Sequence, residues 1–241
     1  MIWIIGGTSE ARKLIDKLGE SCNYLVTIAT EGGRDFFNSK NLFVGRLTKR
    51  QMEEFALINK VDILVDLSHP YAKVVSENAK EVCEKLGLKY IRYVRKKTPS
   101  YGYGTYLNSY EETYEYLKTL EGNVFFTTGS KNIPDFEKIK AGNRFIYRIL
   151  PVTESLLIAE KENIHMRDLL AMVGPFSKEM NMEMLKHFNA KYCVLKDSGP
   201  PGGTIEKLKA CEELGIEAII IGRDEEVGQE DIDKIIEMIK C

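Results

Sequence analysis

The stretch "VLKDSGPPGGTIEKL", residues 194–208, places Lys196, Asp197 and Ser198 between a short apolar run and a helical pattern. An ammonium, a carboxylate and a hydroxyl in one junction suit the binding of an anion or the transfer of a proton. Three glycines and two prolines follow, which are residues with special backbone conformations. A plain turn needs none of these groups, so this junction is a candidate functional site.

The first apolar run of the chain leads into a glycine turn, "IIGGTSEARKL". Aligned on Gly6, the turn follows the dinucleotide-binding fingerprint, except that Thr8 stands where a second glycine would approach the pyrophosphate. Gly6 and Gly7 permit a tight turn, and the backbone N–H groups of the helix start can hold a phosphate. The turn predicts a phosphate site; the alternative is a structural turn in which Thr8 or Ser9 caps the helix.

The end of the second apolar run bears on which dinucleotide would bind. In dinucleotide-binding folds an acidic residue at this point binds the ribose 2′-hydroxyl. Glu31 would therefore favour NAD, whereas Thr30 and Arg34 suit the 2′-phosphate of NADP. We expect NADP rather than NAD; in the alternative, Arg34 is a solvated residue at a helix start.

The stretch "LSHPYAKV" places His69 at the end of another strand pattern. Its imidazole could donate a proton or bind a ligand oxygen. A structural interpretation explains most of the stretch: Ser68 or His69 caps a helix that begins at Pro70, which lacks the N–H left unbonded there. His165 and His187 fall in a loop and at a helix end, where we expect structural roles.

Two strand ends in the second half also combine glycine with polar side chains. "FFTTGSKNIPDF" sets two threonines, Ser130 and Lys131 beside a glycine, which suits phosphate or carboxylate, although Ser130 could simply cap a helix. "VGPFSKEMN" caps a helix with Ser177 and could aim backbone N–H groups at an anion.

Short apolar runs alternate along the chain with stretches of helical period. This alternation predicts parallel sheets with helices on both faces, a doubly wound α/β fold in which ligands bind at the carboxyl ends of the strands. The expected strands are Ile2–Ile5, Tyr24–Thr30, Leu42–Gly45, Asp62–Ser68, Tyr90–Val94, Val124–Thr128, Phe145–Leu150, Leu169–Val173, Cys193–Lys196 and Ala218–Gly222. The expected helices include Glu10–Leu18, Ala72–Leu86, Glu111–Leu120, Lys178–Phe188, Ile205–Leu214 and Gln229–Ile239.

The alternation breaks at "RKKTPSYGYGTYLNSY", residues 95–110, which carries charge, a proline and two glycines. We expect a domain hinge there, between an N-terminal domain of residues 1–98 and a C-terminal domain of residues 99–241. Two Rossmann-like halves with a cleft between them follow from this division.

The composition narrows the class of protein. The chain has 241 residues and a net charge of −2, which gives no overall basic field for nucleic acid or an anionic membrane surface. The first apolar run is too short for a signal peptide or a membrane span, so we expect a cytoplasmic protein. Five widely spaced cysteines predict neither a disulfide framework nor a metal site. Without a P-loop, a GxSxG elbow or an HExxH motif, we expect a cofactor to carry the reaction.

In their order and spacing, five motifs resemble the precorrin-6A reductase family of cobalamin biosynthesis: "IIGGTSEARKL", "DLSHPYA", "TTGSK", "GPFSKEMN" and "KDSGPPGGTIEKL". The resemblance runs from the first strand to about Arg223. It implies an oxidoreductase that acts on a CH–CH group with NADPH. The substrate it implies is a carboxylate-rich macrocycle, precorrin-6A or its cobalt-containing counterpart, of which one double bond is reduced to give the 6B form. The accompanying proton would come from Asp197, His69 or water.

The resemblance also implies roles for the residues that match its motifs. His69 and Asp197 are the catalytic candidates, and Lys196 would meet a carboxylate of the substrate. The residues expected to hold the cofactor are Gly6, Gly7, Thr8, Ser9, Glu10, Thr30, Arg34 and Ser68. The residues expected around the substrate are Tyr71, Thr128, Ser130, Lys131, Ser177, Lys196, Ser198, Gly202, Gly203 and Thr204.

Two alternatives stay open at this point. A regulatory module that senses NAD(P) would need the cofactor site of the first domain but no polar site in the second. The enzymatic alternative is a different NADPH reductase that acts on a smaller substrate. As partners we expect a tetrapyrrole substrate, neither nucleic acid nor a membrane, and a monomer or a weak homodimer.

Overall fold

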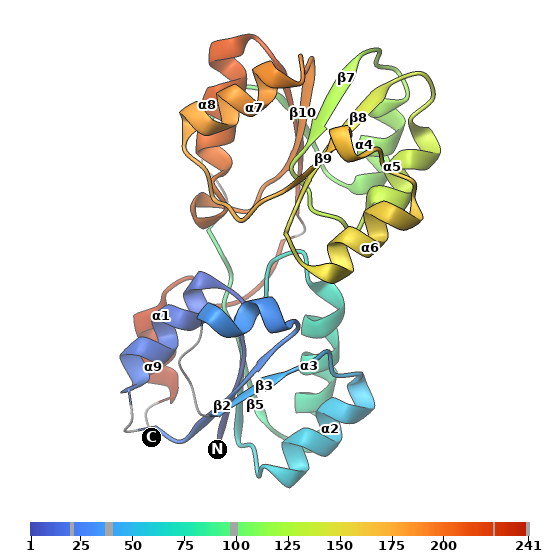
Figure 1. Cartoon of the computed structure of the whole chain (residues 1–241). Helices are drawn as coiled ribbons and strands as arrows, with labels where there is room; N and C mark the ends of the chain where they lie inside the picture. The colour runs from blue at the N-terminus through green and yellow to red at the C-terminus, as the bar shows by residue number, and fades with distance from the viewer. Residues whose placement is uncertain (20–21, 37–40, 97–100, 224, 240–241) are drawn as a thin grey trace. The chain divides into compact units, whose positions relative to one another are not determined.

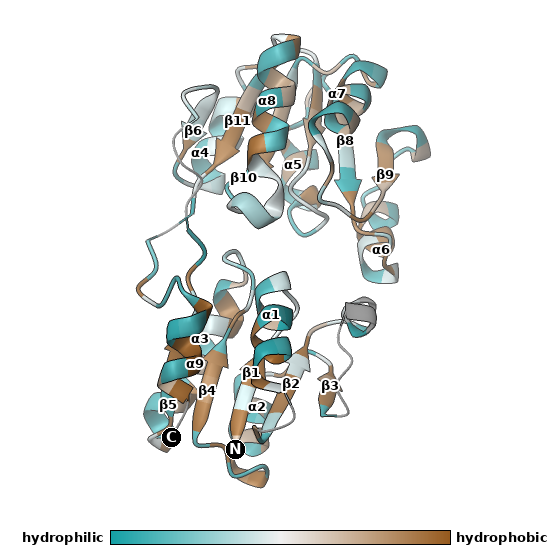
Figure 2. Cartoon of the chain, turned by 90° about the vertical axis from the view of Figure 1, so that its left-hand side faces the viewer, coloured by the Kyte–Doolittle hydropathy of each residue, from teal (hydrophilic) through white to brown (hydrophobic). Residues whose placement is uncertain are grey.

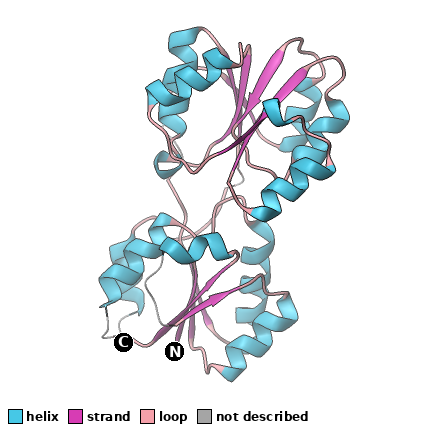
Figure 3. Cartoon of the chain, viewed as in Figure 1, coloured by secondary structure: helices cyan, strands magenta, loops and turns pink. Residues whose placement is uncertain are grey.

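The computed structural model describes residues 1–19, 22–36, 41–96, 101–223 and 225–239. The chain divides into two compact units: Met1–Arg95 with Glu225–Cys241, and Lys96–Asp224. Each unit is built on a parallel sheet with helices on both of its faces (Figures 1 and 3). The predicted doubly wound α/β architecture is therefore confirmed. In the described part of the chain, every helix is too short or too polar to cross a lipid bilayer.

The first unit has five strands in the order β3-β2-β1-β4-β5. The central strand is almost wholly apolar, and both Trp3 and Ile4 on it are fully buried, one toward each layer of helices. Helices α1 and α9 cover one face and α2 and α3 the other. The elements are β1 (Ile2–Ile5), α1 (Ser9–Leu18), β2 (Tyr24–Ile28), a 3-10 helix (Glu31–Phe36), β3 (Leu42–Val44), α2 (Lys49–Ile58), β4 (Ile63–Asp66), α3 (Lys73–Leu86), β5 (Lys89–Arg92) and α9 (Ile232–Ile239).

The second unit has six strands in the order β6-β11-β10-β7-β8-β9. Helices α7 and α8 cover one face, and α4, α5 and α6 the other. The elements are β6 (Thr105–Leu107), α4 (Tyr110–Leu117), β7 (Asn123–Phe126), α5 (Ile133–Ile139), β8 (Arg144–Ile149), α6 (Thr153–Lys161), β9 (Leu169–Ala171), α7 (Lys178–His187), β10 (Tyr192–Lys196), α8 (Thr204–Leu214) and β11 (Glu217–Ile221).

The strands and helices expected from the sequence are all present, with ends displaced by three residues at most. The strand that was missed, β6, lies inside the segment interpreted as a hinge and pairs with β11. Gly104 serves this pairing, because a Cβ there would lie 2.5 Å from the carbonyl oxygen of Ala218. A unit boundary does fall at Arg95, whereas residues 97–100 of the expected hinge lie outside the described residues.

The C-terminal segment belongs to the first unit, which differs from the division at residues 98 and 99. Ile235, Ile236 and Ile239 of α9 pack into the core that α1 also covers (Figure 1, red helix). The backbone of Gln229 bonds to Arg92 and Val94, next to β5. The apolar stripe of α9 was visible in the sequence, but its partner lies more than 200 residues earlier.

A buried ion pair joins the start of α1 to the end of this unit's first segment. Glu10 is 2% exposed, and its Oε1 lies 2.6 Å from Nε of Arg95. Burial alone would raise the pKa of Glu10, but hydrogen bonding to Arg95 and its charge outweigh burial, and the pKa is lowered. Ionised Glu10 therefore stabilises the folded first unit.

Removing Arg95 tests this pair. The variant Arg95→Met leaves a buried carboxylate without its cation and should lower the free energy of unfolding of the first unit by about 3 kcal/mol. Trp3, the single tryptophan, is buried in this unit and reports its unfolding in urea by fluorescence.

The double variant Glu10→Gln/Arg95→Met, which removes both charges, should recover much of that loss. The wild type should lose the contribution of Glu10 as the pH falls below about 4.5, the ordinary pKa of a glutamate, toward the lower folded value. An Arg95→Met unfolding curve equal to that of the wild type would contradict a stabilising pair.

Candidate functional site

Each sheet contains one point where the strand order reverses. In the first sheet β1 is followed by β2 on one side while β4 lies on the other, and in the second sheet β7 stands in the same way between β8 and β10. The loops after two such neighbouring strands run to opposite faces, and doubly wound folds bind ligands where they part. The motifs "GGTSEA" and "LSHPYA" follow β1 and β4, and "TTGSK" and "KDSGPP" follow β7 and β10. The sequence motifs therefore gather at both reversal points.

The glycine turn after β1 has the shape of a phosphate cradle. Gly7 has a φ of 99°, which other residues rarely adopt, and a Cβ on Gly6 would lie 3.2 Å from Val26 Cγ1. Thr8 is the N-cap of α1: its Oγ1 accepts the N–H of Ala11 and donates to the carbonyl of Leu67 after β4. The helix start thus opens at the reversal point, and its dipole favours an anion there. This backbone fits the pyrophosphate of a dinucleotide.

The remaining residues expected to bind the cofactor lie in two places, the first turn of α1 and the segment after β2. Ser9 is exposed on the first turn of α1 and donates to Glu10, whose carboxylate is turned toward Arg95. Thr30 and Arg34 follow β2, where Arg34 lies in the 3-10 helix and pairs with Glu31 at 2.9 Å. Both members of that pair are exposed, so a ligand phosphate could exchange with the carboxylate of Glu31.

The loop after β4 differs from the prediction that Ser68 or His69 caps the next helix. Helix α3 begins at Lys73 and no side chain caps it, so neither Ser68 nor His69 does so, and Pro70 lies in a turn before the helix. His69 Nδ1 instead accepts the N–H of Tyr71 at 3.3 Å, and the two rings lie 5.8 Å apart. An imidazole that accepts at Nδ1 carries its proton on Nε2. Capping of α3 therefore does not explain why a histidine stands at position 69.

Ser68 belongs to a buried network that the sequence analysis missed. Arg92, at the end of β5, donates to Ser68 Oγ at 3.1 Å and pairs with Asp66 of β4 and with Glu226 of the C-terminal segment. Asp66 also accepts the backbone N–H of Ser68 and the hydroxyl of Tyr90. The network fixes the backbone that leads into His69. An arginine at the end of an otherwise apolar strand pattern was the signal that could have revealed it.

In the second unit, the loop after β7 offers one hydroxyl without a partner. Thr128 is 4% exposed, and its buried Oγ1 has no hydrogen bond to any described residue. Asn132, not Ser130, is the N-cap of α5, so the capping alternative for Ser130 is wrong. Ser130 Oγ instead lies 3.0 Å from Ser155 Oγ, while Lys131 is exposed.

The loop after β10 is tightly folded on itself. Gly202 approaches Ser198 so closely that a Cβ would lie 2.3 Å from the Cβ of Ser198, and Gly203 has a φ of 65°. Thr204 is 1% exposed and donates to the carbonyl of Gly199 at 3.3 Å. Asp197 is buried and accepts the N–H of Gly199 at 3.4 Å. These residues shape the loop, and the glycines are required by its close approaches.

Lys196 is held in an environment that disfavours its charge. Its ammonium lies 5.8 Å from the centre of the Tyr110 ring. Burial, and then the charges of Lys131 and Lys207, lower its pKa to about 8. Lys196 therefore lies close enough to Lys131 to be repelled by it, and a bound anion would relieve that repulsion.

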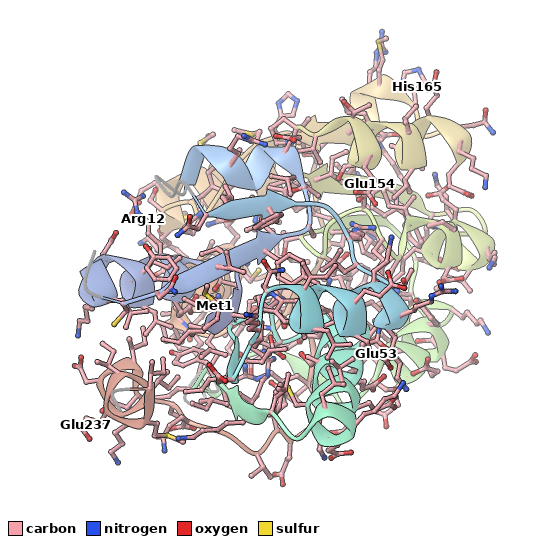
Figure 4. All side chains as sticks on the ribbon, turned by 90° about the horizontal axis from the view of Figure 1, so that it is seen from below. Met1, Arg12, Glu53, Glu154, His165 and Glu237 are labelled. Atoms are coloured by element: carbon pink, nitrogen blue, oxygen red, sulfur yellow. The ribbon has the colours of Figure 1, made fainter. Side chains whose placement is uncertain are left out.

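The other candidates lie elsewhere or have structural partners. Ser177 caps α7 by accepting the N–H of Met180, as predicted, and the same loop touches Gly203 through Pro175. His165 is exposed (Figure 4) and accepts the N–H of Arg167 in a short turn. Among the described residues, no three His, Cys, Asp or Glu side chains gather as a metal site would require.

A comparison of the whole sequence decides the family. The family described as "Precorrin-6x reductase CbiJ/CobK" matches residues 1–240. This chain belongs to that family. Membership makes it an oxidoreductase of cobalamin biosynthesis, as the sequence resemblance implied.

Individual relatives cover nearly the full length of the chain. A cobalt-precorrin-6A reductase of Methanococcus maripaludis is 32% identical over 99% of this chain and 97% of its own. One from Priestia megaterium is 32% identical over 92% and 90%, and a precorrin-6A reductase of Sinorhizobium sp. is 28% identical over 92% and 84%. The solved structure of a "CobK precorrin-6A reductase" matches with a TM-score of 0.81 at 20% identity, covering 99% of this chain and 95% of that one, which supports the fold.

The lowered pKa of Lys196 leads to a stability prediction for this family member. A folded pKa of about 8 against an ordinary 10.5 means that the charged form destabilises the second unit at neutral pH, and that stability rises as the pH increases between these values. Lys196→Met should therefore be more stable than the wild type at pH 7, by about 1–2 kcal/mol, and less dependent on pH.

Urea unfolding followed by circular dichroism measures this, with Trp3 fluorescence marking the transition of the first unit. The matched control is Lys209→Met, an exposed lysine of α8 that should leave stability unchanged. Equal urea-unfolding curves for Lys196→Met and the wild type at pH 7 would show that the charged form of Lys196 does not destabilise the second unit.

Proposed function

We propose that the chain reduces one double bond of cobalt-precorrin-6A with NADPH, giving cobalt-precorrin-6B. The match of residues 1–240 to the reductase family is the observation that carries this proposal. The five relatives at 30–32% identity are named cobalt-precorrin-6A reductases, as is one at 25%, whereas two relatives named precorrin-6A reductases are 28% and 24% identical. The names at the higher identities support the cobalt-containing substrate. A cytoplasmic enzyme that works as a monomer or a weak homodimer is part of the proposal.

The first unit would hold the cofactor through residues at its reversal point. The turn of Gly6 and Gly7 and the start of α1 would bind the pyrophosphate, with Ser9 donating from the first turn. Thr8 would contribute indirectly, since its hydroxyl already joins this turn to Leu67. Arg34 and Thr30 would receive the 2′-phosphate of NADPH. When bound, NADPH would supply the hydride for the reduction.

The second unit would bind the carboxylate-rich macrocycle. Lys196 and Lys131 are cations at its reversal point, and the buried hydroxyl of Thr128 can donate to an oxygen of the ligand. Ser198, Gly202, Gly203 and Thr204 would keep the loop after β10 in the conformation that lets Lys196 reach a carboxylate. Ser130, through Ser155, and Ser177, at the start of α7, would support the neighbouring loops.

A proton must accompany the hydride. We assign it to His69 as an imidazolium, since a neutral ring could give up the proton at Nε2 only by becoming an imidazolate; in the neutral resting ring, Nδ1 accepts the N–H of Tyr71. Tyr71 would orient the ring through its backbone N–H, and Ser68 would fix the loop through Arg92. Asp197 is the second candidate for proton transfer, although its carboxylate already accepts a hydrogen bond within its own loop.

Turnover tests the function directly. Purified protein under anaerobic conditions should oxidise NADPH only when cobalt-precorrin-6A is present, as followed by the absorbance of NADPH and the mass of the product. His69→Phe should slow the reaction by about 100-fold or more while leaving NADPH affinity unchanged.

Oxidation with metal-free precorrin-6A alone would overturn the choice of substrate, and oxidation with neither macrocycle would overturn the function. Full activity in His69→Phe, together with lost activity in Asp197→Asn, would move the proton transfer to Asp197. Full activity in both variants would assign it to water.

Cofactor choice gives a second test. Arg34→Ala removes the cation proposed to meet the 2′-phosphate, so the KM for NADPH should rise by about 10-fold, while the KM for NADH should not change. Steady-state kinetics with each cofactor measures this. Arg50→Ala, which removes an exposed arginine on α2, is the control. A change of equal size for the two cofactors would remove Arg34 from the phosphate site.

A further inference from the structure

Strand β8 ends in an arginine buried under α7. Arg148 is the last residue but one of β8 and is 9% exposed. Its neighbours Tyr147 and Ile149 face the helices α4, α5 and α6, so alternation along the strand turns Arg148 toward α7 and α8. Figure 2 colours this carboxyl end of β8 as hydrophilic. The sequence analysis assigned no role to this residue.

Only part of the guanidinium is engaged by the protein. Nη1 donates to Asn181 Oδ1 at 2.9 Å, and the group lies 4.7 Å from the centre of the Phe176 ring. Within the described residues, Nη1 makes all of the hydrogen bonds of Arg148, and no carboxylate pairs with it. An arginine has five N–H donors in a planar fork that matches a carboxylate. The remaining donors make no hydrogen bond to the described residues.

A second buried cation lies close to Arg148. Lys207 of α8 is 8% exposed, and its Nζ donates to the carbonyl of Gly202 at 2.9 Å. Burial, followed by the charge of Arg148, lowers its pKa to about 8. Like Arg148, it forms no ion pair with any carboxylate of the described residues. The thiols of Cys193 and Cys211 and the carboxylate of Glu206 act on the pKa of Lys207 in the opposite direction but do not outweigh burial and Arg148. Two neighbouring buried cations without a carboxylate in an ion pair are unfavourable in the free protein and attract an anion.

Two motif loops meet beside these cations. A Cβ on Gly203 would lie 3.1 Å from Cβ of Pro175, so the loop before α7 packs against the loop before α8. Phe176 from the first loop covers Arg148, and Gly202 from the second receives Lys207. Arg148 thus lies at the carboxyl edge of the sheet, where ligands of parallel sheets bind.

A purely structural role explains the cations poorly. Asn181 could bond to a neutral side chain in place of Arg148, and Phe176 could pack on an apolar one. Lys196 faces the opposite side of the same sheet, since it lies beside Tyr110 and alternates with Leu195. Cations therefore stand on both faces of this carboxyl edge, as an elongated or cyclic ligand with several carboxylates would require.

We propose that Arg148 and Lys207 form a second subsite that binds one carboxylate of the substrate, on the face of the second sheet opposite to Lys196. The identity of the ligand in this inference rests on the proposed function, whereas the existence of an anion site at Arg148 and Lys207 does not depend on it.

Kinetics of an arginine variant tests the proposal. Arg148→Met should raise the KM for cobalt-precorrin-6A by about 10- to 100-fold, with the affinity for NADPH unchanged, and Arg148→Lys should recover part of the loss. Lys207→Met should raise the same KM by a smaller factor. The matched control is Arg144→Met, on the same strand, where the arginine pairs with Asp168 in a partly exposed position. An unchanged KM in an active Arg148→Met enzyme would overturn the proposal.

A binding measurement separates this proposal from the proposed function. Titration of the wild type with succinate, a small dicarboxylate, should shift the 15N resonance of Arg148 Nε and saturate in the range of about 1–20 mM. Arg148→Met assigns the resonance, and NADPH should not displace succinate. If neither macrocycle is reduced but succinate shifts this resonance, the proposed function fails and the anion site stands. No shift up to about 50 mM succinate would overturn the site.

Discussion

The reversal of strand order within each parallel sheet is the constraint on which the other features of this protein depend. The interior of both sheets is apolar, so polar groups gather where the strands end. The reversal then opens one place at each carboxyl edge where loops part and backbone N–H groups and side chains can face a ligand. Gly6, Gly7 and Thr8 occupy that place in the first sheet, and Thr128 and Lys196 occupy it in the second. In the proposed function, the same topology would serve a dinucleotide in one unit and an anionic macrocycle in the other.

The two units treat buried charge differently. The first unit matches its buried arginines with carboxylates: Arg92 with Asp66 and Glu226, and Arg95 with Glu10. In the described part of the second unit, Arg148 and Lys207 have no such partner. An arginine that is paired with a carboxylate of its own unit stabilises the fold but is not open to a ligand. A buried cation without such a pair lowers the stability of the fold but can bind an anion. This contrast is expected if the first unit recognises phosphate mainly through its backbone and the second recognises carboxylates through side chains.

Much of the fold and part of the site could be predicted from the sequence. The features that could be predicted are those that depend on residues close together in the chain. Strands such as Ile2–Ile5 and the cap at Thr8 depend on a few adjacent residues, so pattern alone located them. Strand β6 and the packing of α9 on α1 depend on partners more than 100 residues away, and no local pattern reveals them. For the same reason the sequence analysis assigned no role to Arg148 and Lys207, whose neighbours on α7 and in the loop before α8 are distant in the chain. Arg92 had a local signal in its position at a strand end, but its partners Asp66 and Glu226 had none. The expected start of α3 at Ala72 was one residue from the observed one, whereas the alternative start at Pro70 was wrong, because a proline suits both a first helical turn and the turn that the chain forms there.

The return of residues 225–241 to the first unit has a consequence for how the chain matures. In the order of synthesis, the second unit is an insertion: all of its residues are synthesised before α9. The isoleucines that complete the core beside α1, and Glu226, which pairs with Arg92, therefore arrive last. The second unit therefore has all of its residues before the first does, and until α9 is added the first remains an open sheet whose face toward α1 is only partly covered. The half with the glycine cradle, although encoded first, is thus the last to become complete.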